Sequence, residues 1–267
     1  MEQLKQRYSY AVILLKELVK TDFKLRYQGS VLGYLWSLLR PLALFLILYI
    51  VFAKFLKIGE AIPDYPVYLL LGIVLWSYFT EVTSSSVGSI VGRGDLLRKL
   101  NFPKYVIVLS GSFSALINLG INTLVIGFFM VISKVEVSPL AILVPLLLIE
   151  LFVLALALAF FLSALYVRFR DIAHIWEVVI QGAFYATPIL YPLSLVPPKA
   201  AKILMLNPMA QIIQDMRYLV VTQQTTTIDD LYGTHFIRVM PVGIIIIILV
   251  LSTSFFRRRS KYFAEEL

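Results

Sequence analysis

The sequence predicts an all-α membrane protein with six transmembrane helices, because its composition is strongly apolar and its apolar residues form six long segments. Of 267 residues, 60% are hydrophobic and 15% are charged, whereas soluble domains have roughly 45 to 50% and about 25%. A soluble domain of this size buries about three quarters of its chain surface, which is too little to hide so many apolar groups. Contact with lipid explains the mean hydropathy of +0.86.

Each predicted span is close to or above the length of about 20 mostly apolar residues that crosses a bilayer. The six segments are 31–53, 65–92, 105–133, 137–167, 172–195 and 239–256. Four ionisable residues lie within them or at their edges: Arg40, Glu81, Glu150 and Glu177. A charge at the centre of a span costs about 2.5 to 3.5 kcal/mol. Each of the four therefore lines a polar path, forms a pair between helices or extends its side chain to the membrane interface.

The basic residues predict the orientation. With six crossings, sixteen of the 24 lysines and arginines fall on the side of the N-terminus. This excess predicts that both termini are cytoplasmic, because short cytoplasmic segments are rich in Lys and Arg. The first 33 residues have no apolar core ending in a cleavage site, so we do not expect a removable signal peptide.

Three segments outside the spans have recognisable patterns. Residues 1–30 predict an amphipathic interface helix, with apolar residues three and four apart, and Gly29 and Gly33 allow a sharp bend into the membrane. Prolines break residues 193–221, which we expect to form two short helices that enter or lie on the outer leaflet. Residues 257–267 are expected to be a cytoplasmic tail.

Several kinds of chemistry are poorly supported. The chain has no cysteine, which excludes disulfides and thiolate metal sites. It has no Gly-Lys dipeptide, so it cannot form a phosphate-binding P-loop, and any ATP hydrolysis must occur in a partner. His174 and His235 are expected on opposite sides of the membrane. We therefore expect no enzyme activity, no metal and no cofactor in this chain.

The cytoplasmic loop 93–104 predicts a short amphipathic helix that ends at Pro103. It either docks into a cleft on a partner or lies at the lipid headgroups. The aromatic residues, 15 Tyr, 18 Phe and 3 Trp, leave a similar choice. They form interfacial belts, or some of them face a pore and stack on sugar rings.

Five short motifs in order resemble the permease subunit of ABC-2-type exporters for cell-surface polysaccharides. They are the bend Tyr27–Pro41, the loop Asp95–Lys104, the turn Val167–Ile172, the Thr187–Pro192 segment and Asn207–Met209. This family includes O-antigen, capsule and wall teichoic acid exporters. The resemblance implies a six-span domain over residues 31–256 in the bacterial cytoplasmic (inner) membrane, and no role in nucleic-acid binding.

The resemblance also implies partners and residue roles. The partners are a second copy of the chain and two copies of a separate ATPase, which binds ATP and Mg; the substrate is a polymer on undecaprenyl diphosphate. The residues implied to contact the ATPase are Arg93, Asp95, Leu97, Arg98, Lys99 and Phe102. A gate for the lipid diphosphate is implied at residues 168–171, comprising Arg168, Arg170 and Asp171. The implied channel lining is Tyr34, Trp36, Arg40, Phe45, Tyr49, Phe184, Tyr185 and Tyr191.

Three alternatives remain open at this stage. An ABC-2 exporter of a small lipid or drug would have the same build without a channel wide enough for sugars. A membrane-embedded enzyme of polymer synthesis would need a cluster of carboxylates or a histidine at one membrane face. A structural scaffold would not need four charges inside the spans.

Overall fold

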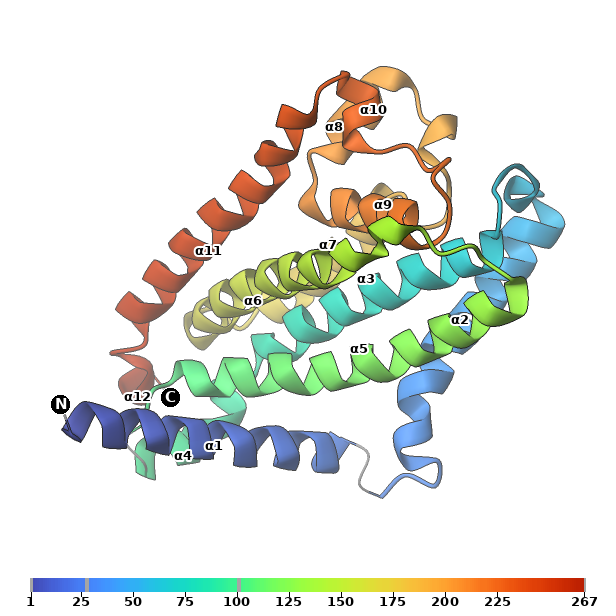
Figure 1. Cartoon of the computed structure of the whole chain (residues 1–267). Helices are drawn as coiled ribbons and strands as arrows, with labels where there is room; N and C mark the ends of the chain where they lie inside the picture. Colours follow the sequence, from blue (N-terminus) through green and yellow to red (C-terminus); the bar gives the residue numbers. More distant parts are fainter. Residues whose placement is uncertain (1, 27–28, 100–101, 267) are drawn as a thin grey trace.

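The computed structural model describes residues 2–26, 29–99 and 102–266, and all regular elements in these ranges are helical (Figure 1). The longer helices are α1 (Glu2–Arg26), α2 (Trp36–Tyr49), α3 (Tyr65–Val87), α5 (Tyr105–Ser133), α6 (Val144–Arg168), α7 (Ile172–Ala186), α9 (Pro208–Val220) and α11 (Val239–Arg259). The shorter ones are α4 (Gly94–Lys99), α8 (Pro198–Met205), α10 (Ile228–Tyr232) and α12 (Phe263–Glu266). Helical turns occupy η1 (Gly33–Leu35), η2 (Ile50–Phe55), η3 (Ile58–Ala61), η4 (Val91–Arg93), η5 (Pro139–Leu143), η6 (Leu193–Leu195) and η7 (His235–Arg238).

The predicted all-α class is confirmed for these ranges. Small parts of four predicted segments lie outside the described residues: residue 1 of the interface helix, 27–28 of the bend, 100–101 of the cytoplasmic loop and 267 of the tail.

Within the described ranges, five helical segments are long and apolar enough to cross a membrane. They are Gly33–Phe55, Tyr65–Val87, Tyr105–Ser133, Pro139–Arg168 and His235–Arg259. The predicted span 172–195 differs, because its α-helix, the 15-residue α7, ends at Ala186 and only a three-residue helical turn, η6, follows within the range. The backbone of Thr187 is extended, with ψ 138°. A residue before proline avoids the helical region, so Pro188 ends the helix well short of the predicted boundary.

Helix α3 forms the centre of the molecule, between α5 and α6 (Figure 1). In its most apolar stretch 78% of the residues are buried, against 11% in the first span, Gly33–Phe55. A helix that is apolar on all sides needs cover on all sides, and α3 receives it from α2, α5, α6, α7 and α9. In the first span, by contrast, few residues are buried.

Helices α6 and α11 pack along each other, and their first residues lie beside the cap formed by α8, α9 and α10 (Figure 1). Ring contacts hold the other ends of the pair together: the centroids of Phe160 and Phe256 are 5.0 Å apart. Both chain termini lie at this second end, near α4 and α12 (Figure 1). The cap and the two termini therefore mark opposite ends of the bundle.

The turn between α1 and α2 contains the two glycines at which the sequence predicts a bend. Gly29 has φ 81° and Gly33 has φ 50°, values that favour glycine because it has no Cβ. Beside the turn, the rings of Phe23 and Tyr34 stack with centroids 4.8 Å apart. The two glycines therefore have the backbone conformation that the predicted bend requires, and α1 packs against α5.

Candidate functional site

The segment η1–α2 and helix α7 expose charged and aromatic side chains beside apolar ones. Arg40 and Glu177 are both exposed, as are Tyr34, Trp36 and Tyr185, the last to 69%. A charge facing the lipid core costs several kcal/mol. These two surfaces are therefore better suited to a polar path or to a second protein surface than to lipid.

The other predicted lining residues are less open. Phe45 is 6% exposed, and its ring centroid lies 5.7 Å from that of Tyr49 and 5.7 Å from that of Phe129. Phe184 is partly buried, and its ring centroid lies 5.9 Å from that of Trp76. Tyr191, also partly buried, donates a hydrogen bond to the carbonyl of Tyr185 at 3.1 Å. The structure thus places Phe45 inside the chain and keeps Tyr34, Trp36, Arg40 and Tyr185 on its surface.

Glu81 joins two helices. Its Oε1 accepts a hydrogen bond of 2.9 Å from Nδ2 of Asn118, and this contact connects α3 to α5. A polar pair of this kind lowers the cost of a carboxyl group within a span. Of the roles open for Glu81, pairing between helices is the one that this contact supports.

The predicted ATPase-contacting loop begins at a polar cluster that involves three elements. Arg93 of η4 forms an ion pair with Asp22 of α1 and donates a 3.0 Å hydrogen bond to the hydroxyl of Ser110 in α5. The Ser110 hydroxyl in turn donates to Asp22 Oδ2 at 3.0 Å. Arg93 therefore fixes the loop to α1 and α5.

The rest of the loop separates into buried and exposed residues. Leu97 and Phe102 are 7% and 4% exposed, so they hold α4 against the bundle. Asp95, Arg98 and Lys99 are exposed and are the members of the predicted set that a partner can reach directly.

The C-terminal helix α12 packs beside this loop. Phe263 has no exposed surface, and its ring contacts that of Phe256 at 5.5 Å between centroids. Lys104 donates to the carbonyl of Ser260, and its Nζ lies 5.8 Å from the Phe263 ring centroid. Burial lowers the pKa of Lys104, while Glu265 opposes that shift. The tail is thus packed against the loop.

The predicted gate residues, Arg168, Arg170 and Asp171, lie exposed in the turn between α6 and α7. Each arginine lies against a ring: Cζ of Arg168 is 5.3 Å from the centroid of Phe169, and Cζ of Arg170 is 5.1 Å from that of Tyr166. Two exposed guanidinium groups in one turn can bind phosphate oxygens in the bidentate manner typical of arginine.

At the opposite end, Arg217 of α9 fixes the segment that follows α7. Its side chain is completely buried. Nη1 donates to the carbonyl of Pro188 at 2.6 Å, Nη2 to that of Ile189 at 2.7 Å, and Nε to that of Tyr68 at 3.1 Å. The sequence pattern gives no sign of this role, in which Arg217 joins α3, α9 and the segment after α7.

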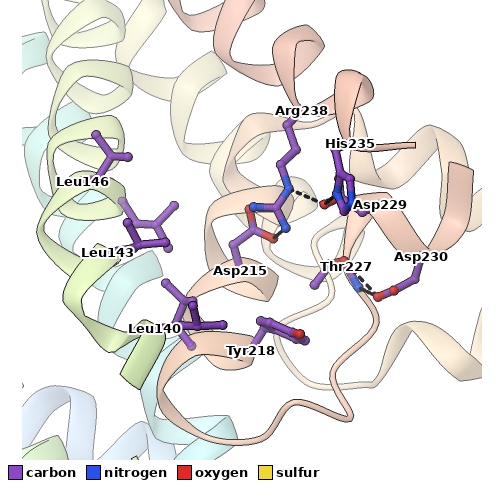
Figure 2. Close-up of a pocket in the computed structure, with 12 residues that line it drawn as sticks. Leu140, Leu143, Leu146, Asp215, Tyr218, Thr227, Asp229, Asp230, His235 and Arg238 are labelled. Carbon is purple, nitrogen blue, oxygen red and sulfur yellow. Dashed lines mark hydrogen bonds and ion pairs between the residues drawn. The ribbon is translucent and has the colours of Figure 1, made fainter. Parts of the chain in front are cut away.

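A pocket of about 400 Å³, which we name the outer pocket because it lies at the cap end of the bundle, is formed between the start of α6 and the cap (Figure 2). One wall is apolar, with Leu140, Leu143, Leu146, Leu147 and Leu219; the other carries Asp215, Tyr218, Thr227, Asp229, Asp230, His235 and Arg238. Arg238 lies between two carboxylates, with Nε 2.8 Å from Asp229 Oδ2 and Nη2 3.6 Å from Asp215 Oδ1. Nδ1 of His235 is 2.8 Å from Asp229 Oδ2. Burial raises the pKa of Asp215, whereas the hydrogen bond from Gln211 and the positive charge of Arg238 lower it.

Comparisons with known proteins agree with this architecture. Residues 13–221 match the ABC-2 type transporter family. The chain is 29% identical to the O-antigen export system permease protein RfbA of Myxococcus xanthus, over 99% of this chain and 98% of the relative. It is 30% identical to the protein of that name from Klebsiella pneumoniae, over 99% of each chain. It is also 23% identical to the polysialic acid transport protein KpsM of Escherichia coli, over 76% of this chain and 79% of the relative.

A helical bundle with several apolar helices of spanning length defines an integral membrane protein. The chain belongs to the ABC-2 type transporter family, and it is an ABC-2 permease.

Proposed function

We propose that this chain is the membrane permease of an ATP-driven exporter that carries a lipid-linked surface polysaccharide out of the cytoplasm. The observation that carries the proposal is the similarity, over nearly the whole chain, to permeases of O-antigen export. The exposed polar and aromatic surfaces of α2 and α7 support it. The substrate would be an O-antigen, a capsular polymer or a teichoic acid on undecaprenyl diphosphate.

In this proposal the active unit is a homodimer with two copies of a separate ATPase, which holds ATP and Mg. Two copies facing each other through α2 and α7 would enclose Arg40, Glu177 and the exposed rings, and so keep these groups out of lipid. Aromatic side chains along such a path would contact the apolar faces of sugar rings without gripping them.

We further propose that the chain lies in the inner membrane with both termini cytoplasmic. The sixth crossing would consist of α7 and the non-helical segment 187–192. Backbone groups in lipid need hydrogen-bond partners, so this segment would have to face a polar path rather than lipid. Helices α8 and α9 would then form the outer re-entrant part.

In this export mechanism the two ends of the bundle would have different roles. The arginine turn 168–171 would bind the diphosphate as it enters. The exposed residues of α4, together with α1, would contact the ATPase and transmit its closure to α5. The cap would shape the exit.

Reconstitution tests the proposal. The chain and its ATPase are placed in liposomes, and ATP hydrolysis and polymer release are measured with and without an undecaprenyl-diphosphate-linked polysaccharide. We expect the lipid-linked polymer to stimulate hydrolysis and to cross the membrane only with ATP. Stimulation by small lipids or drugs alone would favour the other type of ABC-2 exporter.

A further inference from the structure

The end of α1 lies between the loop 93–104 and the start of the first span. Asp22 of α1 forms an ion pair with Arg93, with which the loop begins, and the side chains of Asp22 and Arg93 are 18% and 24% exposed. The hydroxyl of Ser110 in α5, a completely buried residue, bonds to both side chains. Hydrogen bonds to charged groups are stronger than those between neutral groups. The cluster therefore ties the end of α1 to the beginning of the loop.

The residue after Asp22 connects this cluster to the first span. The ring of Phe23 stacks on the ring of Tyr34 in η1, with 4.8 Å between the centroids and 12° between the planes. The intervening turn contains Gly29 and Gly33, and the stack links α1 to η1 without relying on that turn. Tyr34 is 48% exposed and belongs to the surface that the proposed function assigns to the polymer path. An ion pair, one peptide bond and one ring stack therefore lead from the loop to this surface.

A second connection between the loop and the first span runs through α5. Nδ2 of Asn122 donates to the carbonyl of Ser37 at 3.2 Å, and the Ser37 hydroxyl donates to the carbonyl of Tyr34 at 2.7 Å. Among the described helices, however, α5 packs against α1, α2, α3 and α6, whereas α1 packs mainly against α5. A helix with fewer packed neighbours shifts more easily. Of the two helices, α1 is therefore the better carrier of movement.

We propose that Asp22 and Phe23 transmit movement of the loop 93–104 to Tyr34, at the cytoplasmic entrance of the polymer path. The inference rests on the proposed function, in which this loop contacts the ATPase. When the ATPase closes, Arg93 moves with the loop and displaces the end of α1 through Asp22. The ring of Phe23 then shifts the ring of Tyr34. Coupling between distant sites can travel through contiguous packed and hydrogen-bonded side chains. Asp22 and Phe23 are thus positioning residues that touch neither ATP nor polymer.

A spin label next to Tyr34 measures the movement. The chain has no cysteine, so Leu35→Cys, at a half-exposed position in η1, carries a single label. The permease is labelled before it is assembled with its ATPase. We expect ATP and Mg to change the mobility of the label, as measured by electron paramagnetic resonance. Asp22→Asn should reduce this change about fivefold, which is at the lower end of typical coupling between sites.

Further variants separate the contacts of the route. Phe23→Leu removes the ring stack and leaves the ion pair in place, so it should reduce the response even if the Asp22 variants do not fold. Asp22→Arg combined with Arg93→Asp restores a pair of opposite charges. This double variant should recover part of the response that either single exchange loses. Glu17→Gln is the matched control, because Glu17 is an exposed carboxylate on the same helix.

Several results would overturn the proposal. An equal response in Phe23→Leu and in the parent chain would show that the stack carries no movement. An equal loss in Glu17→Gln and Asp22→Asn would show that the pair with Arg93 has no special role. A response that survives in Asp22→Asn and is lost in Asn122→Ala would place the transmission in α5.

The label measurement is independent of the polymer. A complex that hydrolyses ATP without changing the mobility of the label would therefore refute this route and leave the export function untouched. Lack of polymer transport in the reconstituted liposomes would instead contradict the proposed function.

Discussion

The guanidinium of Arg217 lies over the ring of Tyr68, with Cζ 3.5 Å from the ring centroid, although the arginine has no exposed surface. Among the described residues, the Arg217 guanidinium donates hydrogen bonds to three main-chain carbonyls and to Gln214 Oε1. None of these acceptors is a carboxylate that would neutralise its charge. Breaking such a buried cluster by removing one member leaves several polar groups unpaired.

Arg217→Leu should therefore destabilise the protein by about 3 kcal/mol or more, because three carbonyl groups lose their donor while staying buried. Thermal unfolding in detergent, followed by tryptophan fluorescence, measures the effect. Arg217→Lys should recover only part of the lost stability, because one ammonium cannot reproduce the planar guanidinium that donates to three carbonyl groups. Lys199→Leu, an exposed site in the same cap, is the control. Equal melting temperatures for Arg217→Leu and the control would contradict the structural role.

Gly72→Ala tests the same contact from α3. A Cβ at this position would lie 2.6 Å from Nη2 of Arg217, and the guanidinium has little freedom to move because the Ile189 carbonyl holds the same nitrogen. Overpacking of this kind costs about 1 to 3 kcal/mol. Gly127→Ala in α5, where a Cβ meets nothing within 4 Å, should instead be neutral or stabilising. A neutral Gly72→Ala would show that Arg217 can shift.

Phe263→Ala should loosen the loop 93–104. The ring is fully buried, so its removal leaves a cavity under α12 and α4. Hydrogen exchange of residues 94–104 should become faster, and ATPase activity should respond less to substrate. Tyr262→Ala is the neighbouring control, because Tyr262 is 51% exposed. Unchanged exchange in Phe263→Ala would mean that the loop is held without the tail.

Arg168→Ala with Arg170→Ala tests the proposed gate. Loss of two exposed guanidinium groups should raise the concentration of lipid-linked polymer needed for half-maximal stimulation by about tenfold. Assembly with the ATPase should be unchanged, since neither arginine is buried. The control, Arg257→Ala with Arg258→Ala, removes the same charge from the exposed end of α11. If turnover were the same in both double variants, the gate assignment would be wrong.

Part of the candidate site could be predicted because its signals are local. The bend at Gly29 and Gly33 follows from the lack of a Cβ, and the helix start at Asn207 follows from a side chain that accepts from Met209 N at 3.0 Å. Pro188 is also a local signal, because it ends α7. The apolar residues on both sides of this proline nevertheless favour a single longer span over 172–195.

Other features had no local signal. The pattern around Phe45, Leu97 and Phe102 marks them as apolar, yet only the packing of distant helices shows that they are buried. Arg217 reaches the carbonyl of Tyr68, 149 residues away in the chain, and no spacing rule connects the two. The outer pocket likewise brings together the start of α6, α9, α10 and η7.

The sequence by itself determined that this chain is helical and belongs in a membrane, because hydropathy and helix-ending residues act within a few positions of one another. The tertiary structure alone decided which charges are exposed, which are paired and which line a pocket. The physical reason is that the cost of burying a charged group depends on its partners in space, and these partners come from distant parts of the chain.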